Sequence, residues 1–319
     1  MKISLDTAMK NGWKRMTGML FRPFDMAKWL VIGFASFLAS LGRGGGINLN
    51  FPSGNYNENG GNDFQAVQSW LMEHLAAVIF VAAGLFLIAF AVAVLFGWLS
   101  SRGKFVFLHA IAENKAEIRE PWSKYRHLGD NLFFFRLIFS ILSLVSLLIV
   151  AGLSILLAIP FIKSQNFTLS FFMLMFLFVI LIVTLVFIIL TVKVVLMDFV
   201  VPIMFKKNIP AMPAFRVFYD EMCRGHVWDL TLFYIVKFGL GLAAGVVVMI
   251  GTCCTCCVAA LPYISSVVFL PVAVFMESFT LAYIAQHGEE WDLFAWKLEG
   301  EVPPVQPPSP EPPPPEIGA

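Results

Sequence analysis

One uninterrupted apolar stretch constrains this chain more than any other feature. It reads FFMLMFLFVILIVTLVFIILTV from Phe171 to Val192, and its only polar residues are Thr184 and Thr191. No charge appears until Lys193. An α-helix rises about 1.5 Å per residue, so this stretch alone covers the roughly 30 Å hydrocarbon core of a bilayer. The sequence therefore predicts a membrane protein.

The composition of the whole chain agrees with this prediction. Of the 319 residues, 59% are hydrophobic and 13% are charged, whereas about a quarter of the residues of a soluble domain are charged. The net charge of +1 indicates no particular partner. We expect the bilayer to be the main environment of the protein, and nothing in the sequence indicates binding to nucleic acid.

Apolar stretches separated by polar segments predict an all-α fold, a polytopic membrane bundle of about six transmembrane helices. We expect them to form three hairpins with amphipathic helices on the cytoplasmic surface, and to make one membrane domain over residues 1–298. Residues 299–319 form a proline-rich tail, expected to be disordered with polyproline II character. The six predicted spans are residues 24–41, 75–99, 132–162, 171–192, 228–257 and 263–286.

The segment before the first span is basic and amphipathic. Apolar residues recur at helical spacing in residues 1–22, and Lys10, Lys14 and Arg15 lie between them. Such a helix can lie on an anionic membrane face. Alternatively, it is an ordinary helix that packs against the rest of the protein.

The distribution of Lys and Arg predicts the orientation of the chain. Residues 1–22, 100–131 and 202–227 together contain fifteen of the 22 basic residues, whereas the intervening loops contain only Arg43 and Lys163. Cytoplasmic loops are enriched in Lys and Arg. We therefore predict an inner-membrane, multi-pass protein with both termini in the cytoplasm.

Several phrases along the chain together resemble a known family. They are LFRPFDMAKWLVIGF (20–34), LGRGGG (41–46), WLSSRGKFVFLHAIAENKAEIREPW (98–122), MDFVVPIM (197–204), CCTCCVAALPY (253–263) and LAYIAQHG (281–288). The chain resembles an uncharacterised family of bacterial six-span membrane proteins. That family is similar in layout to the membrane domain of some glycerophosphodiester phosphodiesterases. The resemblance implies a membrane bundle but no catalytic residues.

Charged residues within predicted spans are the first candidates for a functional site. Lys237 and Glu277 lie at about 12 and 15 Å from the same side of adjacent spans, by the rise of a helix. Opposite charges at matched depth predict an ion pair, or alternatively a polar cavity or ion path. Arg136 is a secondary candidate. So are Lys193 and Asp198, which we expect to be interface anchors on different faces of one helix.

Four cysteines near the end of the fifth span form a possible thiol cluster: Cys253, Cys254, Cys256 and Cys257. On a regular helix their sulfurs cannot all converge on one tetrahedral zinc ion. We expect a closely packed helix end, with a disulfide or a metal site as the alternatives.

No catalytic motif, phosphate-binding loop or cofactor signature is evident, so the protein is expected not to be an enzyme and to need no cofactor. We predict a non-catalytic scaffold or membrane-assembly factor. The alternative is a transporter or channel for a small polar solute or ion. A protein partner could bind the cytoplasmic segments or the proline-rich tail, in which PxxP forms occur.

Overall fold

The structure, a computed structural model, describes residues 4–41, 70, 72–164, 169–254 and 261–297. Within these ranges the chain is helical and contains no strand, which confirms the predicted all-α class. The α-helices are α1 (Leu5–Phe21), α2 (Met26–Ser40), α4 (Leu75–Glu113), α5 (Arg119–Lys124), α6 (Arg126–Ser164), α7 (Leu169–Val195), α8 (Val201–Lys207), α9 (Ala211–Val217), α10 (Val227–Cys254), α11 (Pro262–Val268) and α12 (Leu270–Ile284). Two π-helical segments, η2 (Leu196–Val200) and η3 (Phe218–Cys223), and two 3-10 turns, η5 (Ala285–His287) and η6 (Glu289–Trp291), complete the described elements.

Four helices in the described chain are long and apolar enough to cross a membrane: α4, α6, α10 and the continuous stretch of α7, η2 and α8. The first and last predicted spans differ from these four. α2 has 15 residues and so rises about 22 Å, less than the hydrocarbon thickness. The last predicted span is divided at Phe269 into α11 and α12, and Pro271 lies in the first turn of α12, where its missing N–H costs no helical hydrogen bond.

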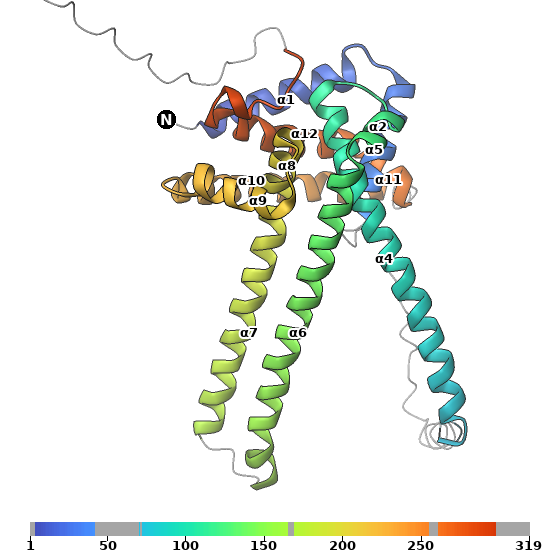
Figure 1. The fold of residues 1–319 in the computed structure, drawn as a ribbon, viewed down its shortest axis with the longest axis vertical. Coiled ribbons are helices and arrows are strands. Elements are labelled where there is room, and N and C mark those ends of the chain that lie inside the picture. The colour runs from blue at the N-terminus through green and yellow to red at the C-terminus, as the bar shows by residue number, and fades with distance from the viewer. Residues whose placement is uncertain (1–3, 42–69, 71, 165–168, 255–260, 298–319) are drawn as a thin grey trace, which may run out of the picture.

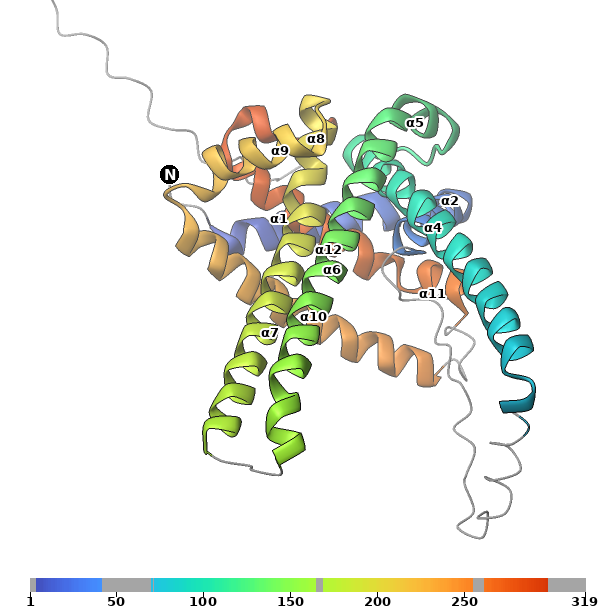
Figure 2. The same cartoon turned by 60° about the horizontal axis from the view of Figure 1, so that its bottom comes forward.

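The long helices project from one packed region, which we call the head. It consists of α1, α2 and residues 100–131, 196–223 and 270–297, which include α5, η2, α8, α9, η3 and α12. In Figure 1 these elements gather at one end of the molecule, α6 and α7 run away from it side by side, and α4 diverges from them. Figure 2 shows α10 leaving in another direction. The predicted hairpin of α6 and α7 is thus present, whereas α2 packs on α11 and on the head portion of α4.

The buried core lies in the head. Residues 100–112 of α4 are all buried, and most of their apolar side chains belong to one cluster that also includes residues of α1, η2, α8 and α12. The three basic segments of the sequence, residues 1–22, 100–131 and 202–227, therefore lie at the same end of the molecule (Figure 1). Their placement on one side agrees with the charge distribution.

α1 packs directly on α12, as the second interpretation of residues 1–22 predicts. Its Ser4 N-cap accepts a hydrogen bond from the Thr7 amide. A Cβ at Gly12 would lie 2.9 Å from the Phe279 backbone nitrogen, so the two helices approach closely. Arg15, one of the basic residues between the apolar positions of this helix, is not on its exposed face. Its side chain is buried, because the guanidinium lies 3.4 Å from the centroid of the Phe294 ring and donates to the Trp296 carbonyl.

The two ends of the described chain hold the head together. The Ser4 amide donates to Gln286 Oε1 at 2.7 Å, and Gln286 Nε2 donates back to the Ser4 carbonyl at 3.0 Å. At the other side of the head, Ala295 N donates to Ala112 O and Trp296 Nε1 donates to Ile111 O. The last carbonyls of α4 thus gain partners from a segment far away in the sequence.

Candidate functional site

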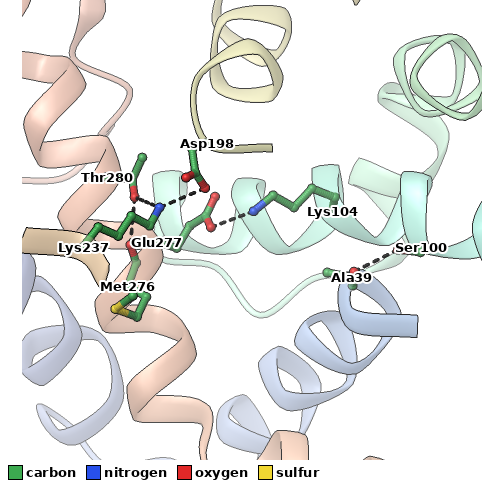
Figure 3. A network of polar contacts seen from close by, with 8 residues as sticks. All are labelled: Ala39, Ser100, Lys104, Asp198, Lys237, Met276, Glu277 and Thr280. Atoms are coloured by element: carbon green, nitrogen blue, oxygen red, sulfur yellow. Dashed lines mark hydrogen bonds and ion pairs between the residues drawn. The ribbon is translucent and has the colours of Figure 1, made fainter. Parts of the chain in front are cut away.

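Four charged side chains and one hydroxyl meet where the long helices leave the head. α4 contributes Lys104, η2 contributes Asp198, α10 contributes Lys237, and α12 contributes Glu277 and Thr280 (Figure 3). We call this set the paired-charge cluster. It joins four elements that are distant in sequence.

The charges of the paired-charge cluster form two ion pairs. Lys104 Nζ lies 2.7 Å from Glu277 Oε2, and Lys237 Nζ lies 2.9 Å from Asp198 Oδ1. Lys237 also donates to Thr280 Oγ1 at 2.8 Å, and Thr280 donates to the Met276 carbonyl. All four ionic side chains are at most 17% exposed. At this burial, each charge depends on its partner for stabilisation.

A π turn brings Asp198 into this cluster. Pro202 has no N–H and therefore cannot donate to the carbonyl four residues earlier, which is that of Asp198. The Val201 amide instead bonds to the Leu196 carbonyl five residues back. A π-helical segment holds more residues in one turn than an α-helix does. The side chains of α8 therefore point in other directions than they would if α7 continued as a regular helix. The proline in MDFVVPIM thus has a direct structural consequence at the site.

The structure brings both residues of the predicted pair, Lys237 and Glu277, into this cluster. The ion pairs described above join each of them to another residue, Asp198 and Lys104 respectively. Asp198 was expected to be an interface anchor. In the structure its carboxylate lies in the cluster, 2.9 Å from Lys237 Nζ of α10.

Sequence reasoning missed Lys104. It lies in the polar segment SSRGK, which reads as the exposed end of a span. The structure continues α4 without interruption to Glu113 and buries Lys104. A detectable signal was present: small residues alternate with the charges at 100–104, and apolar residues follow at once from Phe105. Small side chains permit close helix packing, and Gly103 contacts α2 at Leu38.

Two cavities adjoin the cluster and share Asp198 in their linings. The smaller, of about 340 Å³, is also lined by the other three charged residues of the cluster. The larger, of about 680 Å³, lies between α4, α6 and the α7–η2 junction, and Arg136 and Lys193 line it. Lys193 and Asp198, which were expected on different faces of a regular helix, both border this cavity next to the π-helical segment η2.

The head contains a second ionic site that the sequence did not indicate. Arg102 binds Asp130 through two hydrogen bonds, of 2.9 and 2.8 Å, and Trp98 Nε1 donates to the same carboxylate. The guanidinium also lies 4.3 Å from the centroid of the Trp98 ring. Gly129 leaves room for it, since a Cβ there would lie 2.7 Å from Arg102 Cγ. This arrangement fixes α4 to α6 at the base of the head.

Cys253 and Cys254 are exposed free thiols at the end of α10, whereas Cys256 and Cys257 lie outside the described residues. In the described part of the chain, no three or more His, Cys, Asp or Glu side chains lie together where they could hold a metal ion. The proline-rich tail likewise lies outside the described residues.

The fold and the site define an all-helical protein with four helices able to cross a membrane. Residues 5–293 match the family of unknown function DUF7544, and the chain belongs to that family. None of the curated proteins and none of the solved structures compared with the chain matched it. The similarity in layout to the membrane domain of glycerophosphodiester phosphodiesterases stays a prediction.

Proposed function

We propose that the protein is a non-catalytic scaffold or membrane-assembly factor of the inner membrane. The proposal rests on the exposed sides of its long helices. In the most apolar stretch of α4 no residue is buried, and the buried shares are 11% in α6, 6% in the α7–α8 stretch and 6% in α10. These sides are available to lipid and to helices of other membrane proteins, while the head holds the helices apart.

The small residues of α10 support this proposal. Gly241 and Gly245 are four residues apart, and Gly239 lies close by. A Cβ at any of the three would meet nothing within 4 Å. Helices in a bilayer associate through van der Waals contact, for which small residues permit close approach. This stretch of α10 therefore suits a helix from another protein.

Photocrosslinking in the native membrane tests the scaffold function. A benzophenone amino acid would replace Val246 on α10 or Phe86 on α4, both of which are exposed. We expect a discrete adduct with one membrane protein from at least one position, identified by mass spectrometry. The control places the same probe at Tyr219 on the head, which is also exposed. Adducts with lipid alone from both helices would overturn the proposal.

A transporter or channel is the second candidate, and one observation favours it. The cavity of about 340 Å³ is lined by Lys104, Asp198, Lys237 and Glu277, so charged groups surround a space instead of packing solidly. Proteoliposomes that contain the protein should then conduct H⁺, Na⁺, K⁺ or Cl⁻ faster than empty liposomes. If the Lys237→Gln variant is folded but loses that flux, the protein is a transporter or channel and not a scaffold.

We also propose that the head lies in the cytoplasm, where protein partners could reach the basic segments and the proline-rich tail. The support is the excess of Lys and Arg in the three segments that form or adjoin the head. A reporter fused near Gly54, in the loop between the first two predicted spans, should be active only outside the cytoplasm. Activity only in the cytosol would reverse the orientation.

A further inference from the structure

The larger cavity has the features of a binding site for an anionic amphiphile. Its volume is about 680 Å³, and α4, α6 and the α7–η2 junction form its walls. Arg136, Lys193 and Asp198 are its ionic lining residues, and most of the others are apolar, among them Phe90 and Phe139. Charged and apolar surfaces therefore face one space.

The charges in this lining favour an anion. Asp198 is the one carboxylate in the lining, and it already pairs with Lys237 at 2.9 Å on its other side. Lys193 is exposed and has no ion-pair partner among the residues that the structure describes. Arg136 also lines the cavity, and its guanidinium donates to the Ser101 hydroxyl at 3.1 Å. Two cations and one carboxylate thus line the cavity, and the carboxylate is already paired with Lys237, which is not a lining residue.

The position of the cavity along the helices indicates where such an anion would come from. Gly97 lies in its lining three residues before the buried part of α4 begins, and Lys193 lies two residues before α7 ends. Lys193 is thus at the level where the long helices join the head, and so is the guanidinium of Arg136, which donates to Ser101 in the buried part of α4. Phe90 and Phe139 lie farther along their helices, away from the head. An occupant would need an anionic group near the head and apolar chains along the helices.

We propose that this cavity binds the phosphate head group of an anionic phospholipid from the leaflet on the side of the head. Arg136 and Lys193 contact the phosphate oxygens, and the acyl chains lie against Phe90 and Phe139. Guanidinium and ammonium groups form charge-assisted hydrogen bonds with phosphate, and basic pockets between transmembrane helices are known to take lipid head groups. The proposal does not depend on whether the protein is a scaffold or a transporter.

Native mass spectrometry of the full-length purified protein tests the site. The protein is delipidated in detergent and titrated with phosphatidylglycerol or, separately, phosphatidylcholine. We expect one phosphatidylglycerol per chain to be retained at concentrations about tenfold or more below those needed for phosphatidylcholine, since each basic group near an anionic lipid contributes about 1 kcal/mol. The double variant R136Q/K193Q should lose this preference. Lys115→Gln is the matched control, because Lys115 is an exposed lysine that does not line the cavity.

A steric variant separates binding from folding. Gly97 lines the cavity, and a Cβ there would only touch Phe133 at an ordinary 3.6 Å. Gly97→Leu should therefore occupy part of the space, keep every charge and reduce the retained phosphatidylglycerol, with an unchanged elution profile. Equal retention by the wild type, R136Q/K193Q and Gly97→Leu would overturn the proposal. So would displacement of the lipid by millimolar inorganic phosphate, which would make the cavity a site for a free anion.

Discussion

The two portions of α4 show how differently one helix is stabilised in the two regions of this molecule. Residues 75–99 are apolar and none of them is buried, whereas residues 100–112 include Ser100, Arg102 and Lys104 and are all buried. In a bilayer, lipid surrounds apolar side chains as readily as protein does. Polar groups have no such alternative, and they collect where protein partners surround them. In this chain, a charge next to small residues is the better indicator of the interior.

Exchanging charges within the paired-charge cluster should have the largest effect. The double variant K237E/E277K would place a carboxylate beside Asp198 and an ammonium beside Lys104, so like charges meet at both ion pairs. We expect no folded protein by fluorescence-detected size exclusion. K104E/E277K reverses one pair and keeps opposite charges together, so it should recover part of the yield. Equal yields from the two double variants would show that these pairings are wrong.

Removing one partner of a buried pair should have the next largest effect. Glu277→Gln leaves the Lys104 ammonium, which is 5% exposed, without its carboxylate. We expect a loss of roughly 3–5 kcal/mol in the free energy of unfolding, because the buried Lys104 charge loses a carboxylate 2.7 Å away. Thermal unfolding in detergent measures it. The control is Asp6→Asn, which breaks the solvent-exposed pair of Asp6 and Lys10 and should change little.

Each portion of α4 contains a glycine, and replacing it with alanine tests how closely that portion is packed. A Cβ at Gly103 would lie 2.5 Å from Leu38 Cβ and 2.8 Å from the Leu38 carbonyl carbon, whereas a Cβ at Gly84 would meet nothing within 4 Å. Gly103→Ala should therefore destabilise the protein by about 1–3 kcal/mol through overpacking. Gly84→Ala should leave the melting temperature unchanged or slightly raised, since alanine is the better helix former. Equal effects would show that α2 is not packed on α4 as described.

The smallest expected effect is a pH dependence of the head. Burial lowers the pKa of His287 below its ordinary value of 6.5, against smaller opposing contributions from the Tyr283 and Ile284 backbone. The unfolded chain then binds a proton more readily than the folded chain. Stability from this group is present above about pH 6.5 and is lost as the pH falls toward the lower folded pKa. His287→Gln should reduce the difference in melting temperature between pH 7.5 and pH 5.5. An unchanged difference would exclude His287 as its source.

The sequence predicted the membrane class, the all-α fold and the grouping of the three basic segments, because hydropathy and charge act locally along the chain. It identified Lys237 and Glu277 as residues of one site from their matched depth. It did not predict their partners, because Lys104 belongs to a segment that reads as exposed and Asp198 reaches the cluster through a π turn. Nor did it predict that Arg15 is buried, since the rings that cover Arg15 come from residues 294 and 296.

The contacts between Ser4 and Gln286, and between Trp296 and the end of α4, have a consequence for how the protein is made. The ribosome must synthesise nearly the entire chain before either contact can form, because the partners are separated by 282 and 185 positions. By then the long apolar helices have already emerged. These two contacts therefore form last, and a chain truncated before Gln286 would have its helices in the bilayer without the contacts that close the head. Such a product should be a substrate for membrane quality-control proteases.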